Sequence, residues 1–280
     1  MSVYLSDCYE KSALNIEDGI PVFSVNDFYI ENYDRISSDH LKCFETTGQN
    51  PFMDEKHWVE LENSTERLIH KYAIEQDIKI LDVGVGLGRL LERFPYMSRF
   101  GVDISRGYLR HAKAKGIEVC LSRIEDMPYK KKYFDIVLAT DVLEHVIDLN
   151  IAVREILGIV KEGGFIVVRV PYKEDLAYYL TPTCPYDFVH LRNFDENSLR
   201  VLFEKIFNVQ VIELTYTGYE CGRPKIGANI RYYAAIIRRV LNVVKMINGK
   251  MYNYMVQKLI QPNEINIVIQ NSKKDTKRSR

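Results

Sequence analysis

The chain has 280 residues, 46% of them hydrophobic and 27% charged, which is typical of a globular protein with one large domain or two small ones. Basic and acidic residues both number 38, so the net charge indicates no class of partner. No run reaches about 18 consecutive apolar residues, and the first residues lack the basic and apolar parts of a secretory signal. These features exclude a membrane-spanning helix and predict a soluble or at most peripheral protein.

The five cysteines, at positions 8, 43, 120, 184 and 221, are too scattered to form a Cys-x-x-Cys pair. An odd number of cysteines without a signal peptide is typical of reduced thiols. We therefore expect a cytoplasmic protein, and we assign no metal ligands from the sequence.

Residues 1–70 form an acidic leader that we expect to be a helical cover or lid. Between residues 1 and 60 there are 12 acidic and four basic residues. A helix is predicted across 56–72. The segment 33–52, together with 181–194, is expected to close a pocket, because an open sheet supplies only the floor of a binding site.

Residues 78–170 alternate short β-branched runs with amphipathic stretches, which predicts a parallel sheet with helices on both faces. The predicted strands are 78–83, 99–104, 117–121, 134–139 and 164–170. Helical stretches are expected at 87–94, 106–116 and 149–160. The fold class is therefore α/β, with a doubly wound sheet.

Beyond this region, 194–207 is predicted to be a helix capped by Asp195, and strands are predicted at 209–216 and 265–270. The interval between these two strands is too long for a plain hairpin loop. We therefore expect a helical insertion at about 222–262, within a main domain spanning 71–272. The basic tail, 273–280, is expected to be disordered.

The insertion contains a predicted amphipathic helix at 228–248. Eight bases and no acid lie between residues 223 and 258, and Arg231, Arg238 and Lys245 recur every seven residues. The opposite face is expected to be apolar, with Ile230, Tyr233, Ile237, Val240, Leu241, Val244 and Ile247. Such a helix can lie on an anionic membrane surface, pack on its own domain, or meet the acidic leader. Nucleic acid is less favoured, since one basic helix without an aromatic groove is weak support for it.

The stretch ILDVGVGLGR (80–89) places three glycines where the first predicted strand ends and a helix begins. Either a ligand that presses on the backbone or a tight turn would require glycine there. A dinucleotide-binding motif would have its third glycine at position 89, which is Arg89. The spacing therefore weakens a pyrophosphate assignment, whereas a carboxylate is still compatible with the helix start.

Acidic residues follow the next three strands. Asp103 can accept both hydroxyls of a ribose, or can simply cap the helix that begins near Ser105. In the loop 123–129, Asp126 could accept a hydrogen bond from an adenine amine while Met127 stacks on the ring, although the loop could equally be an ordinary polar one. The fourth strand continues into Asp141, Glu144 and His145, which places titratable groups where the sheet opens.

Taken together, ILDVGVGLGR, GVDIS, IEDMPY, FDIVLATDVLEHV and VKEGGFIVVRVP resemble a class I S-adenosylmethionine-dependent methyltransferase of the small-molecule or glycan type. The resemblance covers about residues 75–216, and 265–270 matches the antiparallel last strand of that family's seven-stranded sheet. Motifs of the family's base methylators, such as Asn/Asp-Pro-Pro-Tyr/Phe, do not occur in the chain.

The resemblance implies S-adenosylmethionine as the cofactor and assigns roles to particular residues. The methionine part would lie against Asp82, Gly84, Gly86 and Gly88. The ribose would bind Asp103, and the adenine would pack against Ile104, Asp126 and Met127. Asp141 would lie beside the reactive sulfonium.

Methyl transfer to a hydroxyl requires alignment of the acceptor and removal of a proton. The candidate bases are His145 and His190, with Glu144 and Asp141 as alternatives, although both histidines could be structural. Arg192 could hold a carboxylate or phosphate of the acceptor.

The expected function is O-methylation of a small molecule, such as a sugar of a surface glycan or its lipid-linked precursor. The alternative is a cofactor-binding but non-catalytic module of the same fold. A nicotinamide-dependent oxidoreductase shares the sheet but not the glycine spacing.

Overall fold

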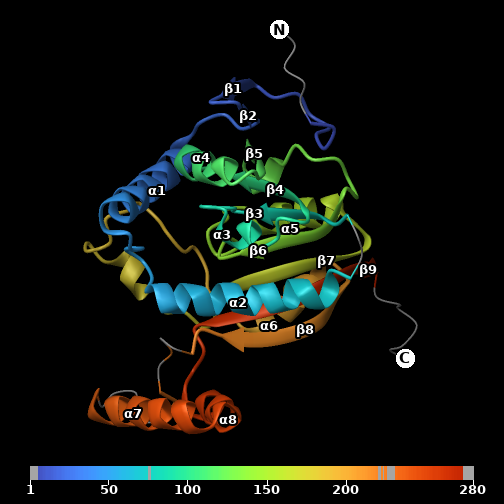
Figure 1. Cartoon of the computed structure of the whole chain (residues 1–280). Coiled ribbons are helices and arrows are strands. Elements are labelled where there is room, and N and C mark those ends of the chain that lie inside the picture. Colours follow the sequence, from blue (N-terminus) through green and yellow to red (C-terminus); the bar gives the residue numbers. More distant parts are fainter. Residues whose placement is uncertain (1–5, 75–76, 220–221, 223, 226–230, 274–280) are drawn as a thin grey trace.

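The computed structural model describes residues 6–74, 77–219, 222, 224–225 and 231–273. One nine-stranded sheet runs through the molecule in the order β1-β2-β5-β4-β3-β6-β7-β9-β8 (Figure 1). Its strands are β1 (Asn15–Glu17), β2 (Ile20–Val22), β3 (Lys79–Val83), β4 (Ser98–Asp103), β5 (Glu118–Leu121), β6 (Phe134–Thr140), β7 (Val160–Pro171), β8 (Val209–Thr217) and β9 (Glu264–Lys273). All seven strands predicted from the sequence are present.

The helices are α1 (Phe28–Thr47), α2 (Glu55–Tyr72), α3 (Arg89–Glu92), α4 (Arg106–Ala114), α5 (Leu149–Ile159), α6 (Glu196–Arg200), α7 (Arg231–Ile247) and α8 (Gly249–Leu259). Two 3₁₀ segments, η1 (Ile124–Asp126) and η2 (Leu176–Leu180), lie in loops. The helix predicted at 194–207 continues from α6 into a π-helical segment, Val201–Ile206. Asp195 is its N-cap, as predicted, and forms a capping box with Ser198.

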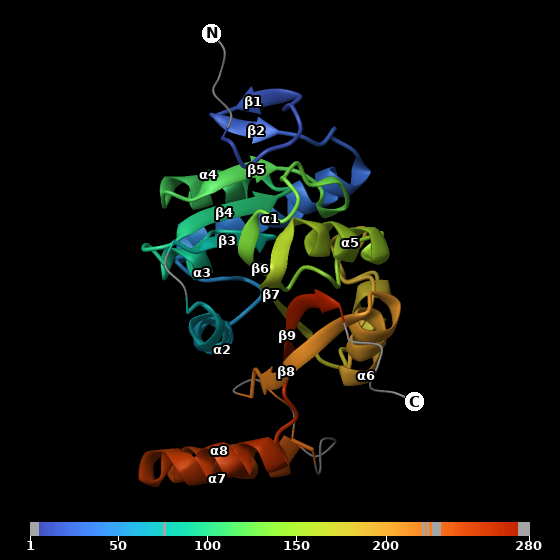
Figure 2. The same ribbon diagram turned by 90° about the vertical axis from the view of Figure 1, so that its right-hand side faces the viewer.

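Helices cover both faces of the sheet because successive side chains of its central strands enter different cores. In β3, Ile80 packs with residues of α2, α3 and α4, whereas Leu81 packs with residues of α5 and α6. Figure 2 shows these helices on opposite sides of the strands. Strands that are apolar on both faces are typical of a buried parallel sheet.

The chain changes direction across the sheet at β3, which pairs in parallel with both β4 and β6. In open α/β sheets a ligand site lies beyond the carboxyl ends of the strands at such a switch point. The last strand, β9, is antiparallel to β7 and β8, as expected. The fold is therefore the predicted α/β doubly wound, mostly parallel sheet.

The leader contains more than helices. It begins with the β1–β2 hairpin, which extends the sheet beyond β5 and was not predicted. Its acids pair with arginines of the main domain, with Glu17 and Asp34 on Arg106 and Asp27 on Arg123. These ion pairs hold the hairpin and α1 against the parallel sheet.

The α7–α8 hairpin lies apart from the sheet in both views (Figures 1 and 2). Leu241, Val256 and Ile260 form its own small core. The predicted apolar face is only partly covered, because Leu241 and Val244 are buried whereas Val240 and Ile247 are 46% and 75% exposed. Ile230 and the side chain of Tyr233, like the tail from 274 onward, lie outside the described residues. No helix within the described ranges is long and apolar enough to cross a membrane.

Candidate active site

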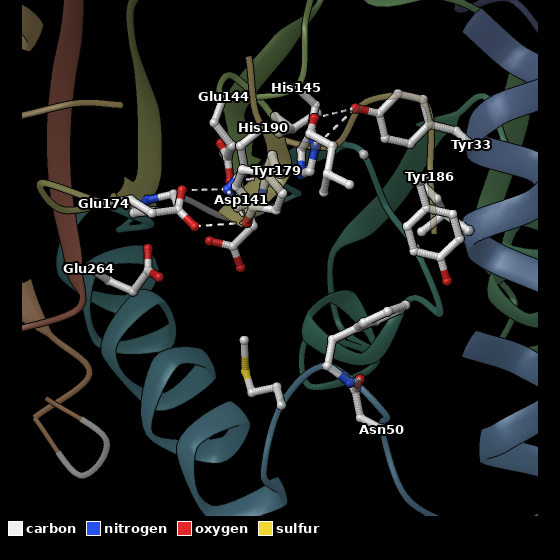
Figure 3. A pocket seen from close by; sticks show the side chains of 18 of the residues that line it. Tyr33, Asn50, Asp141, Glu144, His145, Glu174, Tyr179, Tyr186, His190 and Glu264 are labelled. Carbon is white, nitrogen blue, oxygen red and sulfur yellow. Dashed lines mark hydrogen bonds and ion pairs between the residues drawn. The ribbon is translucent and has the colours of Figure 1, made fainter. Parts of the chain in front are cut away.

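A cavity of about 1000 Å³ opens beyond the carboxyl ends of β3, β4 and β6. Its floor includes Gly84, Asp103 and Asp141. Its walls come from α1, from the segment 50–58 and from the loop 172–190 (Figure 3). Both segments predicted to form a lid, 33–52 and 181–194, contribute residues to these walls. The cavity lies at the switch point of the sheet, where the fold predicts a ligand.

The three glycines of the first turn have different roles. All adopt positive φ angles of 76°, 51° and 71°, which non-glycine residues rarely adopt. A Cβ on Gly84 would lie 2.9 Å from a Val142 methyl, and one on Gly88 would lie 2.7 Å from Ile117. A Cβ on Gly86 would meet no atom of the described residues within 4 Å. Gly84 and Gly86 line the cavity, whereas Gly88 lets α3 pack closely on its neighbours.

Asp103 and Asp82 carry the carboxylates beneath this turn. Asp103 Oδ2 accepts a hydrogen bond from the Gly86 amide at 2.9 Å, and Oδ1 accepts one from the Ser105 amide at 2.9 Å. Each oxygen keeps a further lone pair for a ribose hydroxyl. The helix itself is capped by the hydroxyl of Ser105, so Asp103 is not its N-cap.

Asp82 is buried, and its Oδ1 has no hydrogen-bond partner within the described part of the chain. Burial raises the pKa of Asp82 well above its usual value, with the Arg169 cation acting in the opposite direction. A buried polar atom without a partner is costly and is typical of a ligand site. Asp82 is not among the described residues that line the cavity, so it lies beneath the turn and not in its surface. The open space at Gly86 and the acceptors of Asp103 fit a cofactor with a ribose.

The adenine assignment within the loop 123–129 needs correction. Asp126 has a 71% exposed side chain and pairs with Lys11, and Met127 is completely buried in the core. Neither is among the described residues that line the cavity, which instead receives Ser122, Ile124 and Glu125 from this loop, as well as Ile104 from the preceding strand tip. The prediction placed the inward-facing positions of the loop two residues too late.

Asp141 lines the cavity directly after β6 and has a positive φ of 55°. Its two oxygens accept hydrogen bonds from Arg169 at 3.1 and 2.6 Å. Arg169 also donates to the Leu61 carbonyl and the Thr65 hydroxyl of α2. The sequence analysis missed Arg169, although a lone arginine in the apolar strand GFIVVRV indicates a buried partner.

Glu144 and His145 follow on the same loop. Glu144 is 1% exposed, and neither of its carboxylate oxygens has a hydrogen-bond partner in the described ranges. Burial therefore raises the pKa of Glu144 well above its usual value. Burial and the neighbouring His190 lower the pKa of His145 to about 3, which keeps this imidazole neutral.

His190 approaches the same point from the loop after β7. The two imidazole centroids are 4.6 Å apart at an angle of 79°. His190 Nδ1 lies 2.5 Å from Glu174 and 3.1 Å from the Tyr179 hydroxyl. The sequence placed Glu144, His145 and His190 on two separate segments, and the structure brings them together at one end of the cavity.

Arg192 does not face an acceptor. Its guanidinium donates to the backbone carbonyls of Leu143, Val146 and Ile147. It therefore fixes the loop that carries Glu144 and His145. The predicted contact between Arg192 and an acceptor is therefore not present. A loop arginine can instead donate hydrogen bonds to backbone carbonyls that have no partner in a helix or strand.

Comparison with known proteins agrees with this geometry. Residues 81–168, which contain the glycine turn, Asp103 and the Glu144–His145 loop, match the family described as a methyltransferase domain. An S-adenosylmethionine-dependent methyltransferase of Thermotoga maritima has the same fold, with a TM-score of 0.55 at 15% identity over 87% of this chain and all of that one.

Two curated relatives are more similar in sequence over a shorter range. A ubiquinone biosynthesis O-methyltransferase of Bradyrhizobium is 36% identical over 99 residues, which are 32% of this chain and 39% of that protein. A tRNA (carboxymethyluridine(34)-5-O)-methyltransferase of Arabidopsis thaliana is 33% identical over 94 residues, which are 32% of this chain and 23% of that protein. The chain spans less than half the length of the curated relatives it matches.

Residues 81–168 therefore carry a methyltransferase domain, and the fold around them is the one that the solved S-adenosylmethionine-dependent methyltransferase has. The cofactor of this domain is S-adenosylmethionine, and its chemistry is methyl transfer.

Proposed function

We propose that the chain O-methylates a small molecule, such as a sugar of a surface glycan or of its lipid-linked precursor. One observation carries the proposal. One cavity is lined both by Gly84, Gly86 and Asp103 and by Glu144, His145 and His190. Figure 3 shows the last three residues close together. Cofactor and acceptor can therefore meet inside it, shielded from water by the lid segments.

Several residues of the turn are suited to bind the cofactor. S-adenosylmethionine, when bound, supplies an electrophilic methyl group on a sulfonium sulfur. Asp103 would accept hydrogen bonds from the ribose, Ile104 would pack on the adenine, and Gly84 and Gly86 would allow the methionine part to approach the backbone. Asp141 would provide negative charge beside it, and Asp82 would support the turn from below.

The residues at the other end can take up the proton that a hydroxyl acceptor must lose. His145 Nδ1 lies 3.1 Å from the Val189 carbonyl, which can only accept, so Nδ1 carries the hydrogen and Nε2 carries a lone pair. His190 Nδ1 faces the Glu174 carboxylate, which leaves its Nε2 in the same state. The acceptor proton would pass to one of these nitrogens.

The names of both relatives favour oxygen as the methylated atom. The ubiquinone enzyme and the tRNA enzyme act on different molecules according to their names, but both are named as O-methyltransferases. The alternative, a binding module without turnover, predicts cofactor binding but no product under any condition.

The α7–α8 hairpin favours a lipid-linked acceptor. Val243, Met246 and Ile247 expose apolar side chains, and the sequence from 221 to 263 has bases but no acid. An exposed apolar face flanked by cations suits an anionic lipid surface. We propose that this hairpin, which corresponds to the predicted basic helix 228–248 and its partner α8, brings the chain to a membrane-bound acceptor.

Turnover with a His145→Ala variant tests the acceptor end. We expect the release of S-adenosylhomocysteine from a panel of hydroxylated acceptors to fall by about 100-fold or more, the usual contribution of a positioned base. Affinity for S-adenosylhomocysteine should be unchanged. His70→Ala is the control, because His70 forms a histidine–glutamate pair on α2, away from the cavity. Full turnover in His145→Ala would contradict a role of His145 as the base.

A further inference from the structure

The cavity contains a buried carboxyl group that the described residues do not satisfy. Glu144 is 1% exposed, and within the described residues no group donates to either oxygen. The nearest cations are already engaged, with Arg169 on Asp141 and Arg192 on three backbone carbonyls. Two buried carboxyl oxygens without partners indicate a position for a ligand, because unsatisfied buried polar atoms are unfavourable.

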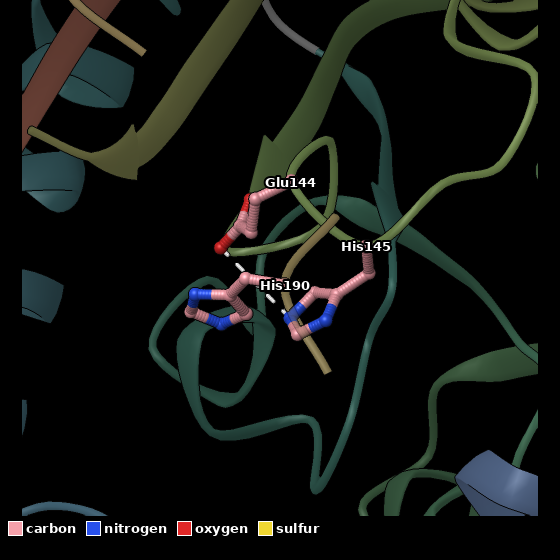
Figure 4. A group of neighbouring side chains, drawn as sticks. All are labelled: Glu144, His145 and His190. Carbon is pink, nitrogen blue, oxygen red and sulfur yellow. Dashed lines mark ion pairs between the residues drawn. The ribbon is translucent and has the colours of Figure 1, made fainter. Parts of the chain in front are cut away.

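Two imidazole nitrogens face this carboxylate. Ligand atoms of Glu144, His145 and His190 all lie within 4.8 Å of one another, and Figure 4 shows the carboxylate directed toward both rings. His145 Nε2 is 3.9 Å from Glu144 Oε1. The converging atoms are one carboxyl oxygen and two imidazole nitrogens, all of which can act as metal ligands.

The far nitrogen of each imidazole is held by a hydrogen-bond acceptor. His145 Nδ1 lies 3.1 Å from the Val189 carbonyl and 3.0 Å from the Tyr33 hydroxyl, which itself donates to Val189. His190 Nδ1 lies 2.5 Å from the Glu174 carboxylate. In the tautomer that these contacts favour, each ring keeps its lone pair on Nε2, and His145 Nε2 is the nitrogen that faces Glu144. Metal-binding histidines are typically oriented by a carboxylate or a backbone carbonyl on their other nitrogen in this way.

The backbone holds the two ligand-bearing segments together. The Leu191 amide donates to the Glu144 carbonyl at 2.8 Å, and the Val189 carbonyl contacts His145 Nδ1 at 3.1 Å. Both neighbours of His190 are therefore bonded to the segment 144–145. Ligands of one ion at about 2.1 Å are separated by about 3–4 Å. The three side chains therefore need to approach by at most about 2 Å to share an ion.

We propose that Glu144, His145 and His190 bind a divalent transition metal ion, with Zn²⁺ as the cation that this donor set suits best. Two imidazoles and one glutamate, with remaining positions open to a cavity, are typical of a catalytic zinc site. The cavity also carries Asp141, Glu174 and Glu264, whose carboxylates favour a cation electrostatically.

The inference rests on the proposed function and specifies its acceptor. An open position on the ion would bind the acceptor hydroxyl and lower its pKa, so that the alkoxide forms near neutral pH. With both imidazoles on the ion, the hydroxyl proton would leave to solvent and not to a histidine. The acceptor oxygen would then form its bond to the methyl carbon as the bond between that carbon and the sulfonium sulfur breaks, with S-adenosylhomocysteine as the leaving group. This favours acceptors with a hydroxyl that can reach the ion from within the cavity.

Metal binding by the full chain is the direct test. The purified protein is stripped with a chelator, dialysed, and titrated with Zn²⁺ in a calorimeter, with elemental analysis of the retained metal. We expect one Zn²⁺ per chain, with affinity at least tenfold lower in Glu144→Gln and in His190→Ala. His70→Ala, which leaves a histidine–glutamate pair outside the cavity incomplete, should bind Zn²⁺ like the unaltered chain.

Binding of S-adenosylhomocysteine to each variant reports separately on folding and on the proposed function. The metal inference would be overturned if the chain bound the cofactor but did not bind one Zn²⁺. It would also be overturned if Glu144→Gln and His190→Ala bound Zn²⁺ as tightly as the unaltered chain. Either result would leave the methyltransferase proposal intact. Zn²⁺ binding that depends on Glu144 and His190, in a chain that binds no cofactor, would support the metal site and contradict the proposed function.

Discussion

At the scale of single residues, Asp103 links the cofactor to the fold. Its carboxylate accepts the amides of Gly86 and Ser105, and thereby shapes the glycine turn as well as facing the cavity. In Asp103→Ala we expect the affinity for S-adenosylhomocysteine to fall at least about tenfold, because hydrogen bonds to a charged group contribute about 1.5–3 kcal/mol. Calorimetric titration measures this loss.

Asp126→Ala is the matched control. The motif in the sequence assigned both aspartates to the cofactor, but the Asp126 side chain is 71% exposed and pairs with Lys11. We expect Asp126→Ala to bind the cofactor like the unaltered chain. Equal losses in the two variants would contradict the geometry of the cavity.

At the scale of elements, a buried ion-pair network attaches α2 to the sheet domain. Glu62, 3% exposed, accepts hydrogen bonds from Arg89 and Arg93 of the α3 region. Removing Glu62 leaves Arg89 and Arg93 with only their more exposed partners, Glu55 and Glu66, so Glu62→Ala should lower the free energy of unfolding by about 2–3 kcal/mol. Urea denaturation measures this change.

Glu55 provides the comparison, because it pairs with the same Arg89 through a side chain that is 58% exposed. Exposed ion pairs contribute about 0–1 kcal/mol, so Glu55→Ala should change stability by less than about 1 kcal/mol. If both variants unfolded at the same urea concentration, the expectation that burial makes the Glu62 network more stabilising than the Glu55 pair would be contradicted.

The elements themselves were largely predictable, since apolar runs of period two and 3.6 fix the seven strands and the helices between them. The β1–β2 hairpin was not predicted, because strands of three residues such as Ile20–Val22 give almost no periodic signal. The site was predictable only in part. Glu144 and His145 follow a strand, but their meeting with His190 depends on the loop 172–190, whose course no local pattern determines.

At the scale of the whole molecule, the α7–α8 hairpin distinguishes a membrane-associated enzyme from a freely diffusing one. Met246 and Ile247 are 88% and 75% exposed. We expect the chain to cosediment with anionic phospholipid vesicles more strongly than with neutral ones. Met246→Glu combined with Ile247→Glu should weaken the partitioning at least about tenfold, since burying each such side chain contributes about 1.5–3 kcal/mol.

Ile74→Glu controls for the loss of exposed apolar surface as such, because Ile74 is 85% exposed next to α2. Vesicle binding should be unchanged in this variant. Equal binding of the unaltered chain to neutral and anionic vesicles would contradict the role of the cationic insertion.

The central claim is that the glycine turn and Asp103 form a site for a methyl donor. Calorimetric titration of the full chain with S-adenosylmethionine, S-adenosylhomocysteine and NAD, in parallel, tests it most directly. The account predicts binding of the first two with micromolar affinity, and no binding of NAD. Failure to bind any of the three would mean that the glycines only turn the chain, and would contradict the account.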